Sequence, residues 1–188
     1  MEKKNNVLLW ISIGLGVLAI LSRIWITIPN FSPILGVGVF ATYALGKRVG
    51  IGITLASIVV SDIVLALTQT WTSFWGFMSF QPVVYGALIL VMLVGYLINK
   101  KAKAHTVLGS AIVGSLLFFI VTNFFVWLDF YGWGMYTKDF TGLVQCYIAA
   151  IPFFKWSILS DIIFSMSLFG VWNLAGHGVN KLVKETPT

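Results

Sequence analysis

The stretch "VLGSAIVGSLLFFIVTNFFVWL", residues 107–128, contains no charged residue and only one amide side chain, that of Asn123. About 20 apolar residues in a helix cross the ~30 Å hydrocarbon core of a bilayer, because lipid offers no partner to an unpaired backbone group. We therefore expect a membrane-spanning helix here. Five further stretches have the same character, at about residues 7–28, 33–46, 51–69, 83–98 and 156–174.

The composition extends this expectation to the whole chain. Of the 188 residues, 59% are hydrophobic and 10% are charged, with a mean hydropathy of +0.94; about 25% charged residues is usual for soluble proteins. We predict one all-α membrane domain, residues 1–188, built as a bundle of six transmembrane helices with short basic tails at 1–6 and 176–188. The start imitates a signal peptide, but its apolar run continues to residue 28 and five more follow, so we interpret it as the first span.

Basic residues indicate the orientation. Lysine and arginine fall before the first apolar stretch, between the second and third, between the fourth and fifth, and after the sixth. The positive-inside bias then predicts a multi-pass membrane protein with an even number of spans and both termini in the cytoplasm. The net charge of +6 follows from this topology. A nucleic-acid partner is not expected, because no polar domain carries the charge.

Residues suited to metals or cofactors are few. Cys146 is the single cysteine, both histidines, His105 and His177, fall in segments predicted to be cytoplasmic, and no CxxC or HxxxH spacing occurs. We expect neither a metal nor a cofactor. A glycine-rich phosphate loop is also missing from the sequence, so an ATPase that energised this protein would be a separate chain.

The connections on the predicted outer side are rich in aromatic residues. Five of the eight tryptophans lie in or beside them: Trp71, Trp75, Trp127, Trp133 and Trp156. Two interpretations stay open, an interfacial aromatic belt or the lining of a ligand site.

The longer of these connections, residues 129–154, has internal order. Asp139 can cap a helix, and the apolar residues 141–154 form about three helical turns that Pro152 is expected to end. We expect a short helix that lies over the outer mouth of the bundle as a lid. Gln145, Cys146 and Tyr147 would then face a ligand.

Four costly polar side chains occur inside the predicted spans. At 1.5 Å per helical residue, Arg23, Asp62, Asn123 and Asp161 fall at one depth in the outer half of the bilayer. Arg23 should pair with one of the two aspartates. Either the layer is a polar contact between helices, or it is the floor of an outward-facing pocket. One arginine against two aspartates leaves a formal charge of −1, which a shared proton, or a cationic or donor group of a ligand, would balance.

Small residues recur every four positions in three spans. This spacing permits close helix contact, either inside the protein or with a separate membrane partner. The positions are Ser12 and Gly16, Gly38, Thr42 and Gly46, and Ser110 and Gly114.

Several longer runs resemble a known family. "IPNFSPILGVGVFATYALG" (28–46), "SDIVLA" (61–66), "TNFFVW" (122–127) and "GLVQCYIAAIPFFKWSILSDIIF" (142–164) resemble an uncharacterised family of small bacterial putative transport proteins. That family is similar to the S components, the substrate-binding subunits, of energy-coupling factor (ECF) vitamin transporters. The resemblance covers about residues 23–170.

The resemblance implies a six-helix fold in the cytoplasmic (inner) membrane of a bacterium, which binds a vitamin from outside beneath its outer loops. A separate ECF-type membrane subunit and two ATPases would drive transport. The nearest analogy is a cobalamin-binding S component, in which a cysteine can ligate cobalt. The alanine-rich coupling motif of S components is not evident in the first span of this sequence.

The leading hypothesis is therefore a non-enzymatic, substrate-binding membrane protein for uptake of a micronutrient. Its ligand would touch some or all of Arg23, Asn30, Asp62, Trp71, Trp75, Asn123, Trp127, Gln145, Cys146, Tyr147 and Asp161. The alternative is a structural or assembly subunit of the membrane whose buried Arg/Asp layer only joins helices. An enzyme is disfavoured because no nucleophile has a base near it in the outer layer, and a channel because no ring of like charge surrounds a pore.

Overall fold

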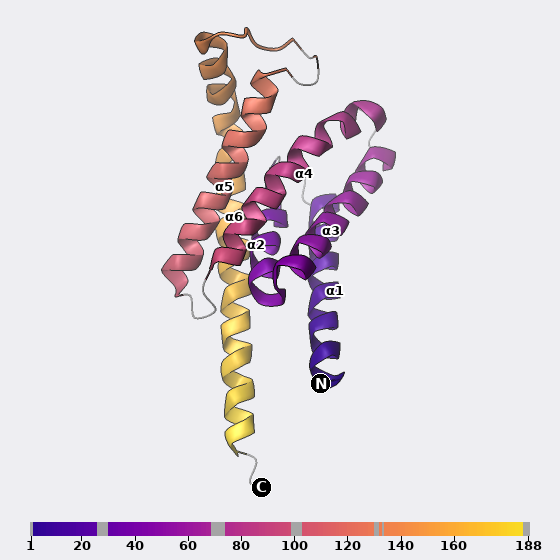
Figure 1. Ribbon diagram of the computed structural model, residues 1–188, viewed down its shortest axis with the longest axis vertical. Helices are drawn as coiled ribbons and strands as arrows, with labels where there is room; N and C mark the ends of the chain where they lie inside the picture. The colour runs from indigo at the N-terminus through magenta and orange to yellow at the C-terminus, as the bar shows by residue number, and fades with distance from the viewer. Residues whose placement is uncertain are drawn as a thin grey trace.

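A computed structural model describes residues 2–25, 30–68, 74–98, 103–129, 132 and 134–185. Side chains are described within residues 10–173 of these ranges, apart from 11, 12, 25 and 74–80. The described chain forms six helices (Figure 1): α1 Glu2–Trp25, α2 Ile34–Leu45, α3 Lys47–Thr68, α4 Phe74–Leu97, α5 Ala104–Trp127 and α6 Phe140–Glu185. The predicted all-α fold is thus confirmed, and each predicted apolar stretch contains a helix.

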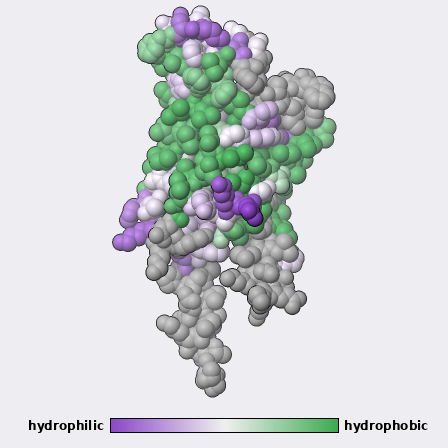
Figure 2. Space-filling model, viewed as in Figure 1, coloured by the Kyte–Doolittle hydropathy of each residue, from purple (hydrophilic) through white to green (hydrophobic). Residues whose placement is uncertain are grey.

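Within the described residues, three segments are long and apolar enough to cross a bilayer: α3, α5 and the Phe140–Asn173 part of α6. Figure 2 shows apolar side chains over a broad region between hydrophilic ones at the top and a second hydrophilic group lower down. Many large apolar side chains in these helices are exposed, among them Leu67, Val113 and Ile163. Such a surface is costly in water and suits lipid. The chain is a helical membrane protein.

The basic residues and the two ends of the chain lie together. Lys47 and Arg48 start α3, and Lys103 precedes α5. In Figure 1, α3 and α5 begin at their lower ends, the start of α1 and the end of α6 lie lower still, and the loop before α6 lies at the top. We call the lower end of the bundle, where these basic residues lie, the basic end, and the upper end, which carries the loop before α6, the loop end.

Helix α2 is the centre of the bundle and contacts all the other helices. Every residue from Ile34 to Tyr43 is buried. With 12 residues it is only about 18 Å long, so the helix predicted at 33–46 exists but is too short to cross a ~30 Å core by itself. Since α2 ends near the basic end, its N-terminus lies inside the bundle.

Close approach to α2 depends on small residues. A Cβ at Gly38 would lie 3.0 Å from Cγ of Met92, and the Thr42 hydroxyl donates a 3.0 Å hydrogen bond to the carbonyl of Met92. The glycines at 16 and 114 likewise face side chains of α3 and α4. For these positions the small-residue spacing serves internal packing, as the first of its two interpretations proposed. Ser12 lies outside the described side chains.

Gly95 of α4 offers a test of this packing. A Cβ there would collide with the Thr42 hydroxyl and the carbonyl of Val39, whereas a Cβ at Gly86, on the same helix, meets nothing within 4 Å. We expect Gly95→Ala to lower the free energy of unfolding by about 1–3 kcal/mol. Gly86→Ala should raise it by about 0.5–1 kcal/mol. Thermal unfolding in detergent measures both; two equal and small effects would contradict the close α2–α4 contact.

Helix α6 departs from the prediction. It runs unbroken from Phe140 to Glu185 through Pro152, so the expected short helix ending at Pro152 is wrong, and with it the separate lid. Proline removes one backbone hydrogen bond, but packing on both sides of it can hold the helix together. Before the proline, Tyr147 donates a 2.7 Å hydrogen bond to the carbonyl of Ile120 on α5; after it, Ser160 donates one of 2.7 Å to the carbonyl of Ser32.

The start of α6 is capped as predicted. The Asp139 carboxylate accepts hydrogen bonds from the Gly142 amide (2.7 Å) and the Thr137 hydroxyl (2.8 Å). These two donors lower the pKa of Asp139 below its ordinary value. A carboxyl whose pKa is lower in the folded state stabilises the fold above its unfolded pKa, and the stabilisation is lost as pH falls through the folded value.

This cap predicts a pH dependence. At pH 7, Asp139→Ala should melt at a lower temperature than the wild type. The difference should shrink as pH falls below about 4, near the unfolded pKa of aspartate. Melting temperatures across this range measure it, with Asp129→Asn as a control that changes another loop carboxylate. A difference that stays constant down to about pH 3 would contradict the role of the charge.

Candidate functional site

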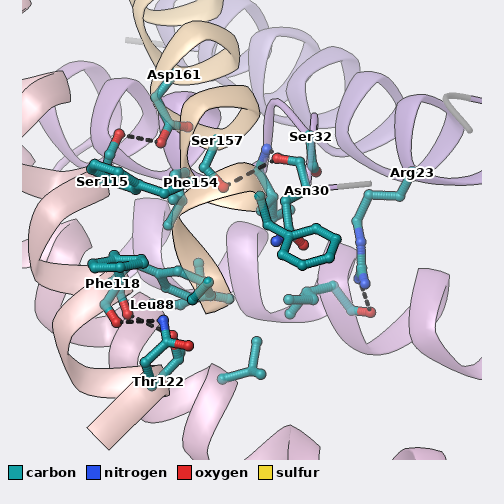
Figure 3. A pocket seen from close by; sticks show the side chains of 18 of the residues that line it. Arg23, Asn30, Ser32, Leu88, Ser115, Phe118, Thr122, Phe154, Ser157 and Asp161 are labelled. Carbon is teal, nitrogen blue, oxygen red and sulfur yellow. Dashed lines mark hydrogen bonds between the residues drawn. The ribbon is translucent and has the colours of Figure 1, made fainter. Parts of the chain in front are cut away.

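A cavity of about 330 Å³ opens between α4, α5, α6 and the segment that leads into α2 (Figure 3). Its polar lining consists of Arg23, Asn30, Ser32, Gln81, Ser115, Thr122, Asn123, Ser157 and Asp161. Its aromatic lining consists of Phe118, Phe119, Phe153 and Phe154. A concave site that is mostly apolar, with a few convergent polar groups, has the composition of a small-molecule site.

One wall of the cavity is irregular backbone. Asn30 has a φ of +59°, which asparagine tolerates, and residues 30–33 are not helical. The Ser157 hydroxyl donates to the Asn30 carbonyl (3.2 Å) and the Ser160 hydroxyl to the Ser32 carbonyl (2.7 Å). Two serine hydroxyls of α6 thus supply hydrogen bonds to backbone carbonyls that lie outside any helix. Non-helical backbone inside a membrane is tolerated where it is buried in protein or lines a cavity.

Asp161 is the buried acid of this cavity. Only 2% of the residue is exposed, and one carboxylate oxygen, Oδ2, accepts a 2.6 Å hydrogen bond from the Ser115 hydroxyl (Figure 3). The other oxygen, Oδ1, has no hydrogen-bond partner. The backbone amide of Gly36, in the first turn of α2, lies close enough to act on this carboxyl, but Oδ1 has no partner that meets the geometry of a hydrogen bond. A buried carboxylate oxygen without a donor is costly, so it is the group of this cavity most in need of a partner.

The other buried acid is fully engaged. Arg23 forms an ion pair with Oδ1 of Asp62 and donates a 2.7 Å hydrogen bond to the Ser61 hydroxyl. Oδ2 of Asp62 accepts a 2.8 Å hydrogen bond from the Tyr85 hydroxyl. This network joins α1, α3 and α4. Asp62 and Asp161 were the two candidate partners of Arg23, and the structure shows that the partner is Asp62. Arg23 lines the cavity, whereas Asp62 does not.

The polar residues do not form the predicted single layer, because they lie at different depths along the wall of the cavity. Asp161 bonds Ser115, which precedes Asn123 by eight residues on α5, a distance of about 12 Å along a helix. Asn123 therefore lies nearer the loop end and Asp161 deeper. The amide nitrogen of Asn123 donates to the Phe119 carbonyl (2.8 Å), which leaves its amide oxygen as an acceptor for the cavity.

The other predicted site residues lie elsewhere. Gln145 is exposed, and the buried Cys146 turns to α5, where its thiol is 3.4 Å from the Asn123 carbonyl. Tyr147 also bonds α5, at the Ile120 carbonyl, and Trp127 donates to the carbonyl of Thr137 (3.0 Å) in the loop before α6. None of these four lines the cavity. Trp71 and the side chain of Trp75 lie outside the described residues.

Sequence reasoning missed the four phenylalanines and Ser115. A signal for them was present: on α6 the lining residues Phe153, Phe154 and Ser157 precede Asp161 at spacings of three and four, which place them on its face. The same spacing relates Ser115, Phe119 and Asn123 on α5.

These features define a helical membrane protein with a polar, aromatic-lined cavity inside its bundle. The chain belongs to a family of unknown function, DUF6580, whose match covers residues 3–182. Neither the search of curated proteins nor the search of solved structures gave a match.

Proposed function

We propose that this protein binds a vitamin or similar micronutrient in the cavity and takes part in its uptake. The observation that carries the proposal is the unpaired carboxylate oxygen of Asp161 in a cavity with four phenylalanines. An unpaired buried polar group costs about 1–3 kcal/mol. Asp161, unlike Ser165 with its unpaired hydroxyl, lines the cavity, where a ligand could supply the missing partner. The site is proposed for binding, without a catalytic step.

The proposal includes a topology. In this topology the chain crosses a bacterial cytoplasmic membrane six times and both termini are in the cytoplasm. The basic end then lies on the cytoplasmic side of the membrane and the loop end on the outer side. The cavity reaches from Asp161 towards Asn123 and Val126, near the loop end of α5. In this arrangement the ligand enters from outside, and separate subunits, an ECF-type membrane protein with its ATPases, supply the energy.

The size of the cavity narrows the ligand. A volume of about 330 Å³ is at the low end for small-molecule sites. It suits a molecule with one or two small rings. A cobalamin is far larger, so the cobalamin-binding analogy is not carried into the proposal.

A panel of vitamins and their precursors tests the function. Added singly to the purified protein, one of them should raise the melting temperature. At a concentration of a hundred times its dissociation constant it should stabilise the fold by about 2.7 kcal/mol. Unchanged melting across the whole panel would contradict the proposal.

One observation favours the alternative of a structural subunit. The Arg23–Asp62–Tyr85 network has its groups paired and joins three helices. If the protein were only structural, Asp161 would serve the same purpose, and both Asp62→Asn and Asp161→Asn would lower the melting temperature with no effect on uptake of any compound.

A further inference from the structure

The charges around the cavity indicate what its ligand carries. Arg23, the one cation among the described lining residues, is already paired with Asp62. Asp161 is left with a single hydrogen bond, from Ser115. When Asp161 is ionised, Arg23, Asp62 and Asp161 together carry a formal charge of −1, and the unpaired part of it lies at the deep end of the cavity.

The N-terminus of α2 compensates this charge only in part. Asp161 lies near the amide of Gly36 in the first helical turn, where the partial positive charge of the helix favours an anion. That effect is worth about 0.3–1 kcal/mol, up to ~2 kcal/mol when partly buried. The penalty for an ion taken out of water is several kcal/mol. The helix end therefore does not neutralise Asp161. A proton neutralises it in the empty site, and a cationic group of a ligand can take the place of that proton.

The aromatic lining favours the same kind of ligand. Phe119 and Phe154 lie 4.5 Å apart between ring centroids, at 35°, and Phe118 and Phe153 add two more rings to the lining. Aromatic faces attract cations and stack with planar groups. The free amide oxygen of Asn123, nearer the loop end, accepts a further hydrogen bond.

We propose, resting on the function above, that the ligand is a planar-ring compound with a protonated nitrogen, which Oδ1 of Asp161 binds while the phenylalanines hold the ring. Anionic and uncharged micronutrients are then poor ligands. The deep position of Asp161 sets the direction: the nitrogen enters first, and the polar substituents of the ring remain near Asn123.

The charge preference can be measured without knowing the ligand. In a Cys146→Ala background, Ser157→Cys places a thiol on the cavity wall, one helical turn from Asp161. Two methanethiosulfonate reagents of similar size, the cationic trimethylammonium-ethyl and the anionic sulfonatoethyl compounds, label it. Both react with the same thiol, so its own reactivity cancels in the ratio of their rates. Met135→Cys, which is exposed in the loop before α6, supplies the reference ratio.

At a pH high enough to ionise Asp161, we expect the cationic reagent to be favoured at Ser157→Cys by about tenfold or more over the reference, as one unbalanced charge at short range predicts. Asp161→Asn should abolish this excess. Asp129→Asn, the same chemical change in the loop, should leave it intact. The comparison of the two reagents needs no substitution at Asp161, so it remains decisive if that variant does not fold.

The outcomes separate this inference from the proposed function. Labelling by both reagents at the reference ratio, or preference for the anion, overturns the cationic ligand and leaves an accessible cavity. The vitamin panel then decides the function. A Ser157→Cys thiol that neither reagent labels shows a closed site, and contradicts both. Cationic preference that survives Asp161→Asn assigns the charge to another group and also overturns the inference.

Discussion

Asp62→Asn is expected to destabilise the folded protein by about 3–5 kcal/mol, the usual cost of removing one partner of a buried ion pair. The substitution leaves the Arg23 guanidinium without its counter-charge, and this side chain is only 17% exposed. It also turns the acceptor of the Tyr85 hydroxyl into an amide, which accepts a hydrogen bond less strongly than a carboxylate. Three helices then lose their common contact.

Unfolding in detergent measures this loss, and two further variants identify its cause. Tyr85→Phe, which removes one hydrogen bond to the same carboxylate, should cost about 1–3 kcal/mol. Arg23→Gln combined with Asp62→Asn should recover part of the stability lost in Asp62→Asn alone, because the unpaired charge is gone. A double variant no more stable than Asp62→Asn would contradict the ion pair as the source of the effect.

Asp161→Asn is expected to change stability in the opposite direction. The Ser115 hydroxyl already has a second acceptor, the Ala111 carbonyl at 3.0 Å. It can donate there and accept a hydrogen bond from the new amide, whose oxygen would then face the Gly36 amide. The variant replaces a buried carboxyl that has one unpaired oxygen by an amide of the same size, so it opens no cavity. We therefore expect a gain of about 1–3 kcal/mol in the free energy of unfolding, together with the loss of ligand binding.

This opposition is the basis for assigning different roles to the two acids. Side by side, the melting temperatures of Asp62→Asn and Asp161→Asn should move to opposite sides of the wild type. Stability given up in the native protein at a functional site is a common trade-off. A loss for Asp161→Asn as large as that for Asp62→Asn would make Asp161 a structural residue and remove the main support for a binding site.

Much of the architecture could be predicted because the bilayer restricts it. Helices are the economical way to pair backbone groups in lipid, so apolar runs predicted all six helices, and the cost of buried charge predicted that Arg23 pairs with an aspartate. The choice between Asp62 and Asp161 could not be predicted. It depends on which helices are neighbours, and in the described part of the chain α1 packs on α2 and α3 but not on α6.

The errors arose where tertiary contacts override local preference. Proline ends most helices, yet α6 continues through Pro152, with contacts to neighbouring segments before and after it. The continuous helix turns Cys146 and Tyr147 towards α5 and away from the cavity. The polar residues lie at different depths for a similar reason, because a depth counted along each helix assumes that all six cross the bilayer from one plane. The short, buried α2 shows that they do not.

Two kinds of buried polar group therefore coexist within one bundle. The Arg23–Asp62–Tyr85 network is complete and joins helices, whereas the Asp161–Ser115 pair is incomplete and lines a cavity. Only the second kind leaves a group that a ligand can satisfy.

Native mass spectrometry of two neighbouring variants tests the location of the ligand most directly. Ala150 lines the cavity and Ala149, the residue before it, is exposed, so Ala150→Phe fills the site and Ala149→Phe makes the same change outside it. With the panel compound that stabilises the wild type most, we predict one bound molecule per chain in the wild type and in Ala149→Phe, and none in Ala150→Phe. Undiminished binding to a folded Ala150→Phe protein would contradict the cavity as the binding site.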